Sequence, residues 1–577
     1  MIQKALIRAL GLTALISLSG QVWSIPPLGG FLPGSTLPEQ VNKGIAKQQP
    51  TQTRSVAAPE APQEESKEEK ALNEQAKKIK FQLKDIQLEG NHVYSTSELS
   101  VLYRDKLHRT ISVADLFGIV QSITNYYRNN GYILSRAVLP PQHVKNGEVK
   151  IQIIEGYIDR VDVGGTPRGA RCQVQAFGNK IKQCPPLQLK RMEYYLLLAN
   201  ELPMTQVKSV LSPSKTHTGA ADLTLMTDNR PISGYVSYDN YGTRYIGPQQ
   251  MTANVALNSF ATSGDSLQLT VTKTPKGGEL TNSDLNYSAA VNDEGVRGLV
   301  GATRTQTHPL FVLQPANIDG LSQNYYTNFN FPVIRSRSSS LTLRAGFNYL
   351  DSHVTTFESD LYTDHLRNLD VGATYNVADR FLGSNLLSAD IRQGLPIWGY
   401  TSDTNPATAL TSRPGGHAVY TKFAGTASRL QVLSTAFSLY GLIQGQWAGN
   451  ALLASEQFAY GGSQLGRGYD VAEIIGDKGL AGTLELRYDK GFSRVIQDIQ
   501  FYTFYDLGAI WNYNNIGGVP RKVSGATTGI GARFYFTKYV SGNFMWTQTL
   551  TKQVAAEELI GDGRRPRVFF SVVVALS

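Results

Sequence analysis

The segment SLTLRAGFNYL, residues 340–350, decides the fold class of this 577-residue chain. In an extended strand, Leu341, Leu343 and Phe347 fall on one face, while Arg344 and Asn348 fall on the other. This alternation with period two predicts a β-strand with one face in an apolar environment and the other in a polar one.

The same alternation recurs throughout the C-terminal part of the chain. It is clear in DSLQLTVTKT (265–274), GTLELRYD (482–489) and RVFFSVVVALS (567–577). A soluble sandwich also alternates, but here the apolar faces are deep enough for membrane-crossing strands of about 9–11 residues. The opposite faces carry Arg, Glu and Asp, which suits a water-filled lumen. We therefore expect residues 230–577 to form an antiparallel transmembrane β-barrel, with room for roughly 14 to 18 strands.

The N-terminus, MIQKALIRALGLTALISLSGQVWS, has the pattern of a secretory signal peptide over residues 1–24. Basic residues precede a short apolar run, and small residues follow it, so we expect cleavage after Gly20 or Ser24. No later segment approaches about 18 uninterrupted apolar residues. The expected mature protein is exported and has no helical membrane span.

Residues 25–80 form a segment rich in Pro, Ala, Glu and Lys, which predicts a solvated linker. Within it, residues 32–49 could form a short helix between prolines, although their low apolar content fits a linker as well. The residue pattern changes at Phe81, where apolar and polar residues begin to alternate. Residues 81–156 are read as strand, helix, helix, strand and strand, and residues 157–229 as a second small α/β unit.

The two cysteines are Cys172 and Cys184. In an oxidising compartment we expect them to form one disulfide, with two free thiols as the alternative. Neither has a second Cys or a His at ligand spacing, so no metal site is predicted.

Composition and motifs exclude several functions. The net charge is +9, but the basic residues are scattered and form no stripe with interleaved aromatics, so nucleic acid is not an expected partner. Lipopolysaccharide or an acidic secreted protein fits this charge. The chain lacks H-E-x-x-H and G-x-S-x-G, and the carboxylates of Asp470 and Glu473 are interpreted as solvated. We therefore expect no catalytic residue and no cofactor.

Four segments, in this order, are similar to one known family. They are GYILSRAVLPPQHVKNGEVKIQIIEGYI (131–158), SYDNYG (237–242), LGRGYD (465–470) and FYDLG (504–508). Over residues 81–577 the chain resembles the outer-membrane transporters of two-partner secretion (TpsB type), also called hemolysin secretion/activation proteins. This family lies within the superfamily of POTRA-barrel insertases.

The resemblance implies a mainly β architecture: a sixteen-stranded barrel over 230–577, preceded by two periplasmic POTRA domains over 81–156 and 157–229. It implies a plug helix, for which residues 32–49 are the candidate, and a long extracellular loop at about 455–482. The chain departs from many outer-membrane barrels by ending in Ser577 rather than an aromatic residue. Recognition by the barrel assembly machinery is then expected to use Phe569 and Phe570.

The implied function is secretion. A monomeric pore in the outer membrane of a Gram-negative bacterium would recognise an unfolded exoprotein through that protein's N-terminal secretion domain. It would translocate the exoprotein without ATP. The alternatives are a barrel-assembly insertase, which usually has more POTRA domains, and a passive porin, which has none.

The resemblance also names site residues. In the family, the arginine of the loop motif, here Arg467, meets the aspartate of a strand motif, here Asp506, inside the lumen. We call this pair the lumen latch. Its setting comprises the loop residues Gly466, Gly468 and Tyr469 and the strand residues Phe504 and Gly508.

The residue pattern supports this pairing independently. Tyr505 and Leu507 form an apolar face, so Asp506 points the other way, into the lumen. The guanidinium fork matches a carboxylate in two-point contact. Glu485 also faces inward, on the strand after the loop, and is the candidate secondary partner that would compete with Asp506 for Arg467.

Overall fold

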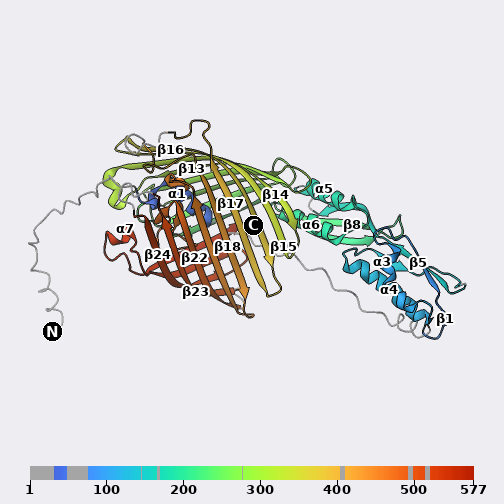
Figure 1. Ribbon diagram of the computed structural model, residues 1–577. Coiled ribbons are helices and arrows are strands. Elements are labelled where there is room, and N and C mark those ends of the chain that lie inside the picture. Colours follow the sequence, from blue (N-terminus) through green and yellow to red (C-terminus); the bar gives the residue numbers. More distant parts are fainter. Residues whose placement is uncertain are drawn as a thin grey trace, which may run out of the picture.

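The computed structural model describes residues 32–48, 76–144, 146–165, 169–275, 277–402, 410–491, 498–513 and 520–576. A large barrel of strands carries two small α/β domains at one end (Figure 1). We call this the proximal end of the barrel and the opposite one the distal end. The predicted signal peptide, most of the predicted linker and Ser577 lie outside the described residues. Among the described residues, no helix has both the length and the apolar character needed to cross a membrane.

Sixteen strands of the described chain close into one antiparallel barrel, which confirms the predicted fold class. Each strand pairs with its neighbours in the sequence of barrel strands, and the last strand pairs with the first. The strands are β9 (Ile232–Asp239), β10 (Gln250–Asn258), β11 (Ser266–Lys273), β12 (Leu280–Ala290), β13 (Arg297–Thr307), β14 (Ile318–Arg335), β15 (Ser339–Thr356), β16 (Ser359–Ala378), β17 (Gly383–Gly394), β18 (Thr421–Val432), β19 (Phe437–Ala448), β22 (Lys478–Gly491), β23 (Asp498–Trp511), β24 (Lys522–Tyr535), β25 (Val540–Thr549) and β26 (Arg567–Leu576).

The alternation in the sequence separates the two faces of this wall. Leu343 and Leu484 lie on the outer face and are exposed in the isolated chain, where a lipid environment would cover them. Arg344, next to Leu343, instead pairs with Asp390 of the neighbouring part of the wall. Closure leaves no free sheet edge in the membrane, because the barrel pairs every strand on both sides.

The first small domain follows the expected order of elements. Its three-stranded sheet has the order β2 (Asp85–Glu89), β5 (Glu148–Ile154) and β4 (Arg136–Val138). Helix α4 (Val113–Asn129) packs against it, and α3 (Thr96–Ser100) is shorter. The short strands β1 (Lys80–Gln82) and β3 (Thr110–Ser112) form a second, two-stranded sheet.

Helix α4 begins where the sequence provides a cap. Ser112 and Asp115 form a capping box, in which each side chain accepts a hydrogen bond from the other residue's backbone N–H. The hydrogen bonds from Ser112 to the Asp115 carboxylate lower the pKa of Asp115.

The second small domain repeats this plan. Strands β6 (Tyr157–Gly165), β8 (Ala220–Asn229) and β7 (Thr205–Pro213) form its sheet, in that order. Helices α5 (Arg171–Lys182) and α6 (Leu189–Glu201) pack on it through Val174, Phe177 and Leu198.

The predicted disulfide is wrong in this structure, because both described cysteines are free and exposed. Cys172 lies in the first turn of α5, and Cys184 lies just beyond its last residue, Lys182. A helix rises 1.5 Å per residue, so it separates the two ends by roughly 18 Å. A disulfide needs Cα atoms within about 7 Å. The distance between the two cysteines was expected to be short, because the pattern of residues 171–182 did not reveal helix α5.

The second domain is bound to the proximal rim of the barrel through the turn between β12 and β13. Glu294 in that turn accepts hydrogen bonds from the ammonium of Lys180 (2.5 Å) and the hydroxyl of Tyr195 (2.6 Å). Both contacts lower the pKa of the Glu294 carboxyl, that of Lys180 the more. Arg335 at the end of β14 pairs with Glu201 of α6 (2.8 Å). These contacts fix the domain beside particular strands.

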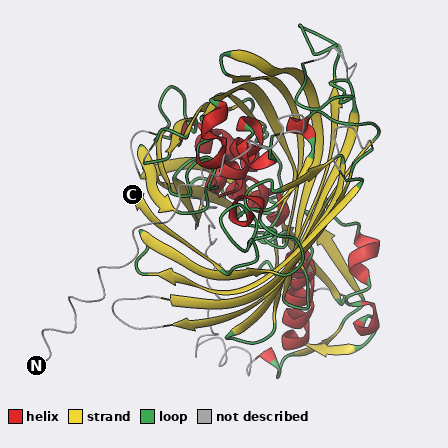
Figure 2. Cartoon of the chain, turned by 90° about the vertical axis from the view of Figure 1, so that its left-hand side faces the viewer, coloured by secondary structure: helices red, strands yellow, loops and turns green. Residues whose placement is uncertain are grey.

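Two elements fill the inside of the barrel. Figure 2 looks into the distal end and shows helical turns enclosed by the ring of strands. One element is the helix α1 (Pro38–Gln48), with the 3₁₀ turn η1 (Gly34–Thr36) before it, which lies within the candidate plug segment 32–49. The other is the connection between β19 and β22, residues 449–477, which contains η4 (Ala454–Glu456), β20 (Phe458–Tyr460) and β21 (Ile474–Gly476). We call this connection the inner loop. Residues 478–482, expected in the loop, belong to strand β22.

Candidate functional site

The tip of the inner loop turns sharply at Gly466. This residue has a φ of +69°, a conformation that favours glycine. The N–H of Tyr469 donates to the carbonyl oxygen of Gly466 (2.8 Å) and closes the turn. Arg467 follows Gly466, and its side chain contacts the inner wall formed by β22 and β23.

Arg467 contacts two carboxylates at once. Its Nε and Nη2 donate to the two oxygens of Asp506 at 3.1 and 2.8 Å, and its backbone N–H donates to Asp506 Oδ2 at 3.0 Å. Its Nη1 donates to Glu485 Oε2 (2.5 Å) and its Nη2 to Thr483 Oγ1 (2.7 Å). The guanidinium also lies 3.5 Å from the ring centre of Phe504. Glu485 is thus a simultaneous partner rather than a competitor of Asp506.

The ion pairs of Arg467 are buried, so breaking them would cost free energy. Asp506 is 0% exposed and Arg467 is 5% exposed. Glu485 also accepts from Arg487 (2.7 Å) and Arg533 (2.8 Å), so it is shared among three guanidinium groups. A buried charge that loses its partner remains uncompensated, which typically costs 3–5 kcal/mol.

Gly508 provides the space in which the loop packs against the wall. A Cβ at this position would lie 2.4 Å from the ring of Tyr460 in strand β20. Tyr460 in turn packs near Tyr469, with ring centres 5.8 Å apart, and both rings are buried. The glycine of the strand motif therefore fits the base of the inner loop rather than Arg467 itself.

The segment after the loop tip is fixed by the last distal connection, between β25 and β26, and by the first residue of β26. The hydroxyl of Tyr469 donates to the carbonyl of Lys552 (3.0 Å). Asp470 pairs with Arg567 (2.7 Å), and Glu473 pairs with Lys552 (3.0 Å). The interpretation of Asp470 and Glu473 as solvated was wrong, because their side chains are 1% and 3% exposed. The sequence of a glycine-rich loop does not show that these two carboxylates become buried in the lumen.

Helix α1 lies against the opposite part of the wall. Val41 and Ile45 on its apolar side, and Leu37 directly before the helix, pack on residues of the distal connections and of β14 to β16, among them Leu313 and Val354. Glu39 accepts a hydrogen bond from Ser352 Oγ (2.8 Å). This stripe of three apolar residues was too narrow to predict a buried helix from the sequence.

The polar side of α1 binds the root of the inner loop. Gln40 Nε2 donates to the carbonyl of Ala454 (2.5 Å), and Lys43 Nζ donates to the carbonyl of Ser455. The next residue, Glu456, forms ion pairs with Lys422 (2.6 Å) and Arg392 (3.0 Å) of the wall. Glu456 was missed by sequence reasoning. Its partners, on strands β17 and β18, lie 64 and 34 residues earlier in the chain.

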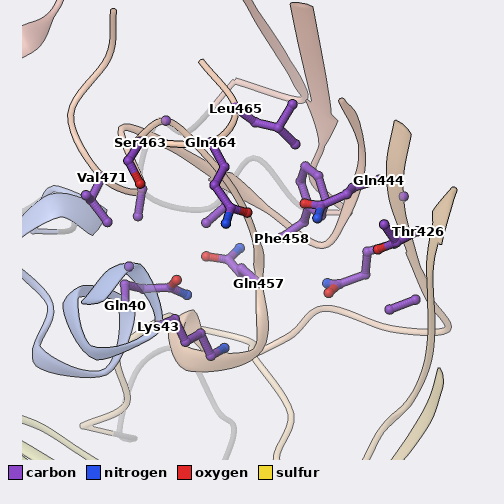
Figure 3. Close-up of a pocket in the computed structure, with 18 of the residues that line it drawn as sticks. Gln40, Lys43, Thr426, Gln444, Gln457, Phe458, Ser463, Gln464, Leu465 and Val471 are labelled. Carbon is purple, nitrogen blue, oxygen red and sulfur yellow. The ribbon is translucent and has the colours of Figure 1, made fainter. Parts of the chain in front are cut away.

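A cavity of about 220 Å³ remains between α1, the inner loop and strands β18 and β19. Figure 3 shows Gln457 in it, between Gln40 and Lys43 of α1 and Thr426 and Gln444 of the wall. Carboxamides and small residues form most of its lining, including Gly425 and Gly445. Such a surface forms hydrogen bonds and presents no deep apolar pocket.

The described part of the chain brings together no group of three or more His, Cys, Asp or Glu side chains that could hold a metal ion. The site is built from ion pairs and hydrogen bonds that the inner loop and α1 form with the wall.

Comparison with known proteins places this architecture in a family. The model of the haemolysin secretion/activation protein family ShlB/FhaC/HecB matches residues 221–534. The chain belongs to this family. The model of the ShlB-type POTRA domain matches residues 81–156, the first small domain. Members of the haemolysin secretion/activation family are TpsB-type transporters of the outer membrane rather than enzymes, and their POTRA domains lie in the periplasm. The proximal end is therefore periplasmic and the distal end extracellular.

Individual relatives agree with this assignment. The heme/hemopexin transporter protein HuxB of Haemophilus influenzae is 24% identical over 464 residues, 78% of this chain and 81% of HuxB. The outer membrane transporter CdiB of Dickeya dadantii is 22% identical over 78% of this chain and 80% of its own. The structure of CdiB from Escherichia coli superposes with a TM-score of 0.69 at 18% identity, covering 93% of this chain and 96% of that one.

Proposed function

We propose that this protein exports one secreted partner protein, which reaches the periplasm unfolded, binds the POTRA domains in extended form and crosses the barrel without nucleotide hydrolysis. The observation that carries the proposal is the filling of the barrel. Helix α1 and the inner loop occupy the lumen and are held to the wall by side-chain packing and hydrogen bonds, so departure of α1 would widen the passage through the barrel.

Strand edges of the POTRA sheets supply a docking mode. β4 lies at the edge of the first sheet and β7 at the edge of the second. An extended chain can add to such an edge through main-chain hydrogen bonds, largely independently of its sequence. β4 has only three residues, and the Ala137 N–H already donates to Thr124 Oγ1 of α4 (3.0 Å). β7 has nine, and its exposed Val210 offers an apolar contact beside the edge. We therefore place the main docking edge on β7.

Transport without ATP follows from the compartment. The periplasm contains no nucleotide pool, and the described chain offers charge networks and carboxamides rather than a phosphate-binding loop. Folding of the partner outside the cell would draw the chain outward. The cavity between α1, the inner loop and strands β18 and β19 fits this role, since its carboxamides can form hydrogen bonds with an extended chain.

The test uses the full-length protein in lipid nanodiscs and, as probe, an N-terminal fragment of the large secreted protein encoded beside the transporter gene. We expect the fragment to bind and expect Val210→Asp to weaken binding about tenfold. The matched control is Val101→Asp, which changes an exposed apolar residue of the first small domain. Equal binding by both variants would show that β7 is not the main docking edge. A transporter gene with no such neighbour, together with a general defect in outer-membrane protein assembly on its deletion, would favour an insertase.

A further inference from the structure

Basic and aromatic side chains alternate along the outer face of the barrel at the extracellular ends of β19 to β24. Lys478, the first residue of β22, lies opposite Trp511, the last residue of β23. On its other side, Trp511 lies opposite Lys522, the first residue of β24. Trp447 of β19 continues the row, because the centre of its ring is 5.3 Å from the ammonium of Lys478. These four side chains therefore lie at one height of the wall.

The row marks the extracellular edge of the apolar belt. Lys478 shares the outward face of β22 with Leu480 and Leu484, and Trp511 shares that of β23 with Leu507. These leucines are exposed in the isolated chain and lie on the periplasmic side of the row. Tryptophan concentrates where the hydrocarbon layer meets the headgroups. The row is therefore at the level of the headgroups of the outer leaflet.

Both lysines of the row lie against aromatic rings rather than against carboxylates. The ammonium of Lys478 is also 4.3 Å from the ring centre of Tyr513, and that of Lys522 is 5.7 Å from the ring centre of Trp511. Among the described residues, neither lysine forms an ion pair. Asp477, directly before Lys478, is 0% exposed and accepts the N–H of Tyr513 (2.9 Å) instead. The two positive charges are thus free to bind an anionic group of the membrane.

Another part of the extracellular rim has the opposite charge. The outer face of β14 to β16 carries Asp319, Asp351 and Asp360 there, with side chains 62%, 32% and 58% exposed. Their histidine partners are charged only when protonated. Arg367 is buried and paired with Asp351 (2.9 Å), which leaves Arg304 as an exposed positive charge near three carboxylates. Charge complementarity therefore directs an anionic lipid to the row on β19 to β24.

The outer leaflet of this membrane supplies a lipid of matching chemistry, lipopolysaccharide. Its lipid A part carries a phosphate at each end of a disaccharide, with acyl chains on one side and core sugars on the other. Neighbouring strands are about 4.8 Å apart, so Lys478 and Lys522, two strands apart, are separated by roughly 10 Å. Two cations at this spacing, with the indole of Trp511 between them, suit two phosphates that sugar rings connect.

We propose that the extracellular ends of β19 to β24 bind one lipopolysaccharide molecule, in which Lys478 and Lys522 pair with the two phosphates of lipid A. Trp511 packs against the sugar rings between these phosphates, and the acyl chains cover outward leucines such as Leu480. The bound lipid also stabilises the root of the inner loop, because Lys478 directly follows Asp477, the last residue of that loop. The inference concerns the lipid around the barrel and holds whichever polypeptide the barrel carries.

Titration of the full-length protein in mild detergent, followed by native mass spectrometry, tests the proposal. The probe is lipopolysaccharide truncated to lipid A and its innermost core sugars, which retains both phosphates. A lysine beside an anionic lipid contributes about fivefold in affinity, so Lys478→Gln/Lys522→Gln should raise the Kd at least about tenfold. Lys478→Arg/Lys522→Arg keeps both charges and should bind like the wild type. The matched control is Lys538→Gln, because Lys538 also lies over an aromatic ring, that of Tyr539 (4.7 Å), but at the periplasmic end.

Two further lipids separate this site from a general attraction to anionic membranes. Monophosphoryl lipid A lacks one phosphate and should bind the wild type about fivefold more weakly. Phosphatidylglycerol has a single phosphate and no disaccharide, and should bind more weakly still. An unchanged Kd in Lys478→Gln/Lys522→Gln would overturn the proposal, as would phosphatidylglycerol that binds as tightly as lipopolysaccharide. If the double variant lacks the heat-modified mobility of a folded barrel, each single variant is read in the same way, with an expected change of about fivefold.

Discussion

The two elements inside the barrel are held there by different chemistry. The tip of the inner loop is fixed by buried ions, since Arg467 contacts both Asp506 and Glu485. Helix α1 is fixed by an apolar stripe, by hydrogen bonds to backbone carbonyls such as that of Ala454, and by the hydrogen bond that Glu39 accepts from Ser352. The inner loop is also connected at both of its ends to strands of the wall, β19 and β22.

This difference indicates which element can leave. When Arg467 moves away, two buried carboxylates lose a partner, which costs several kcal/mol. When α1 moves away, water can replace most of the hydrogen bonds it makes, and the main loss is the burial of a few apolar side chains. We infer that the loop tip stays in the lumen and that α1 can leave it.

The largest expected effect is that of Arg467→Ala. We expect a folded barrel in the membrane, a free energy of unfolding lower by about 3–5 kcal/mol and secretion reduced more than tenfold, because Asp506 remains buried without its partner. Heat-modified mobility in electrophoresis reports the fold, and the amount of exported partner reports function. The control is Arg429→Ala, which breaks a pair with Asp379 that is about 40% exposed at the arginine and should cost at most about 1 kcal/mol. Normal secretion by Arg467→Ala would contradict the role given to the lumen latch.

The next effect concerns the plug. Val41→Asp places a charge on the buried side of α1 and should displace the helix while the barrel stays folded. We expect the mean conductance in planar bilayers to rise far more than tenfold. Ala46→Asp adds the same charge at an exposed position of α1 and should leave the conductance unchanged. Equal behaviour of the two variants would mean that burial does not keep α1 in the lumen.

A smaller effect is expected where the loop packs on the wall. In Gly508→Ala the new methyl group would clash with the ring of Tyr460, so the loop base must shift, at a cost of about 1–3 kcal/mol. In Gly441→Ala the nearest atom is 3.9 Å away, so this variant should be neutral. Denaturant unfolding of both variants, followed by tryptophan fluorescence, gives the comparison. A neutral Gly508→Ala would show that the loop base adapts freely.

The smallest effect belongs to a single neutral hydrogen bond of α1. Gln40→Ala removes the donor to the carbonyl of Ala454, which typically contributes about 1 kcal/mol. The open probability of single channels should therefore rise about fivefold, far less than in Val41→Asp. If Gln40→Ala reduced secretion as much as Arg467→Ala, the distinction between α1 and the loop tip would be contradicted.

The fold class could be predicted because its signal is local. Residues 340–350 contain the alternation of a barrel strand, and β15 includes them all. The same alternation directs Asp506 inward without any knowledge of its partner. In contrast, the disulfide prediction failed, because a spacing of twelve residues has a different length in a loop and in helix α5.

The contacts that fill the barrel could not be predicted in this way. Glu39 meets Ser352 across 313 residues. No periodic pattern encodes such a separation. The carboxylates of Asp470 and Glu473 were assigned to solvent, because a loop sequence does not state whether the loop folds outward or into the lumen.

By itself, the sequence determined the strands, the two small domains and the direction in which each strand residue points, since these depend on neighbours along the chain. Only the tertiary structure decided that Arg467 is shared by Asp506 and Glu485, that α1 lies in the lumen and that Lys478 and Lys522 lie in one row. Closure of the barrel brings these groups together, and a closed ring is a property of all its strands at once.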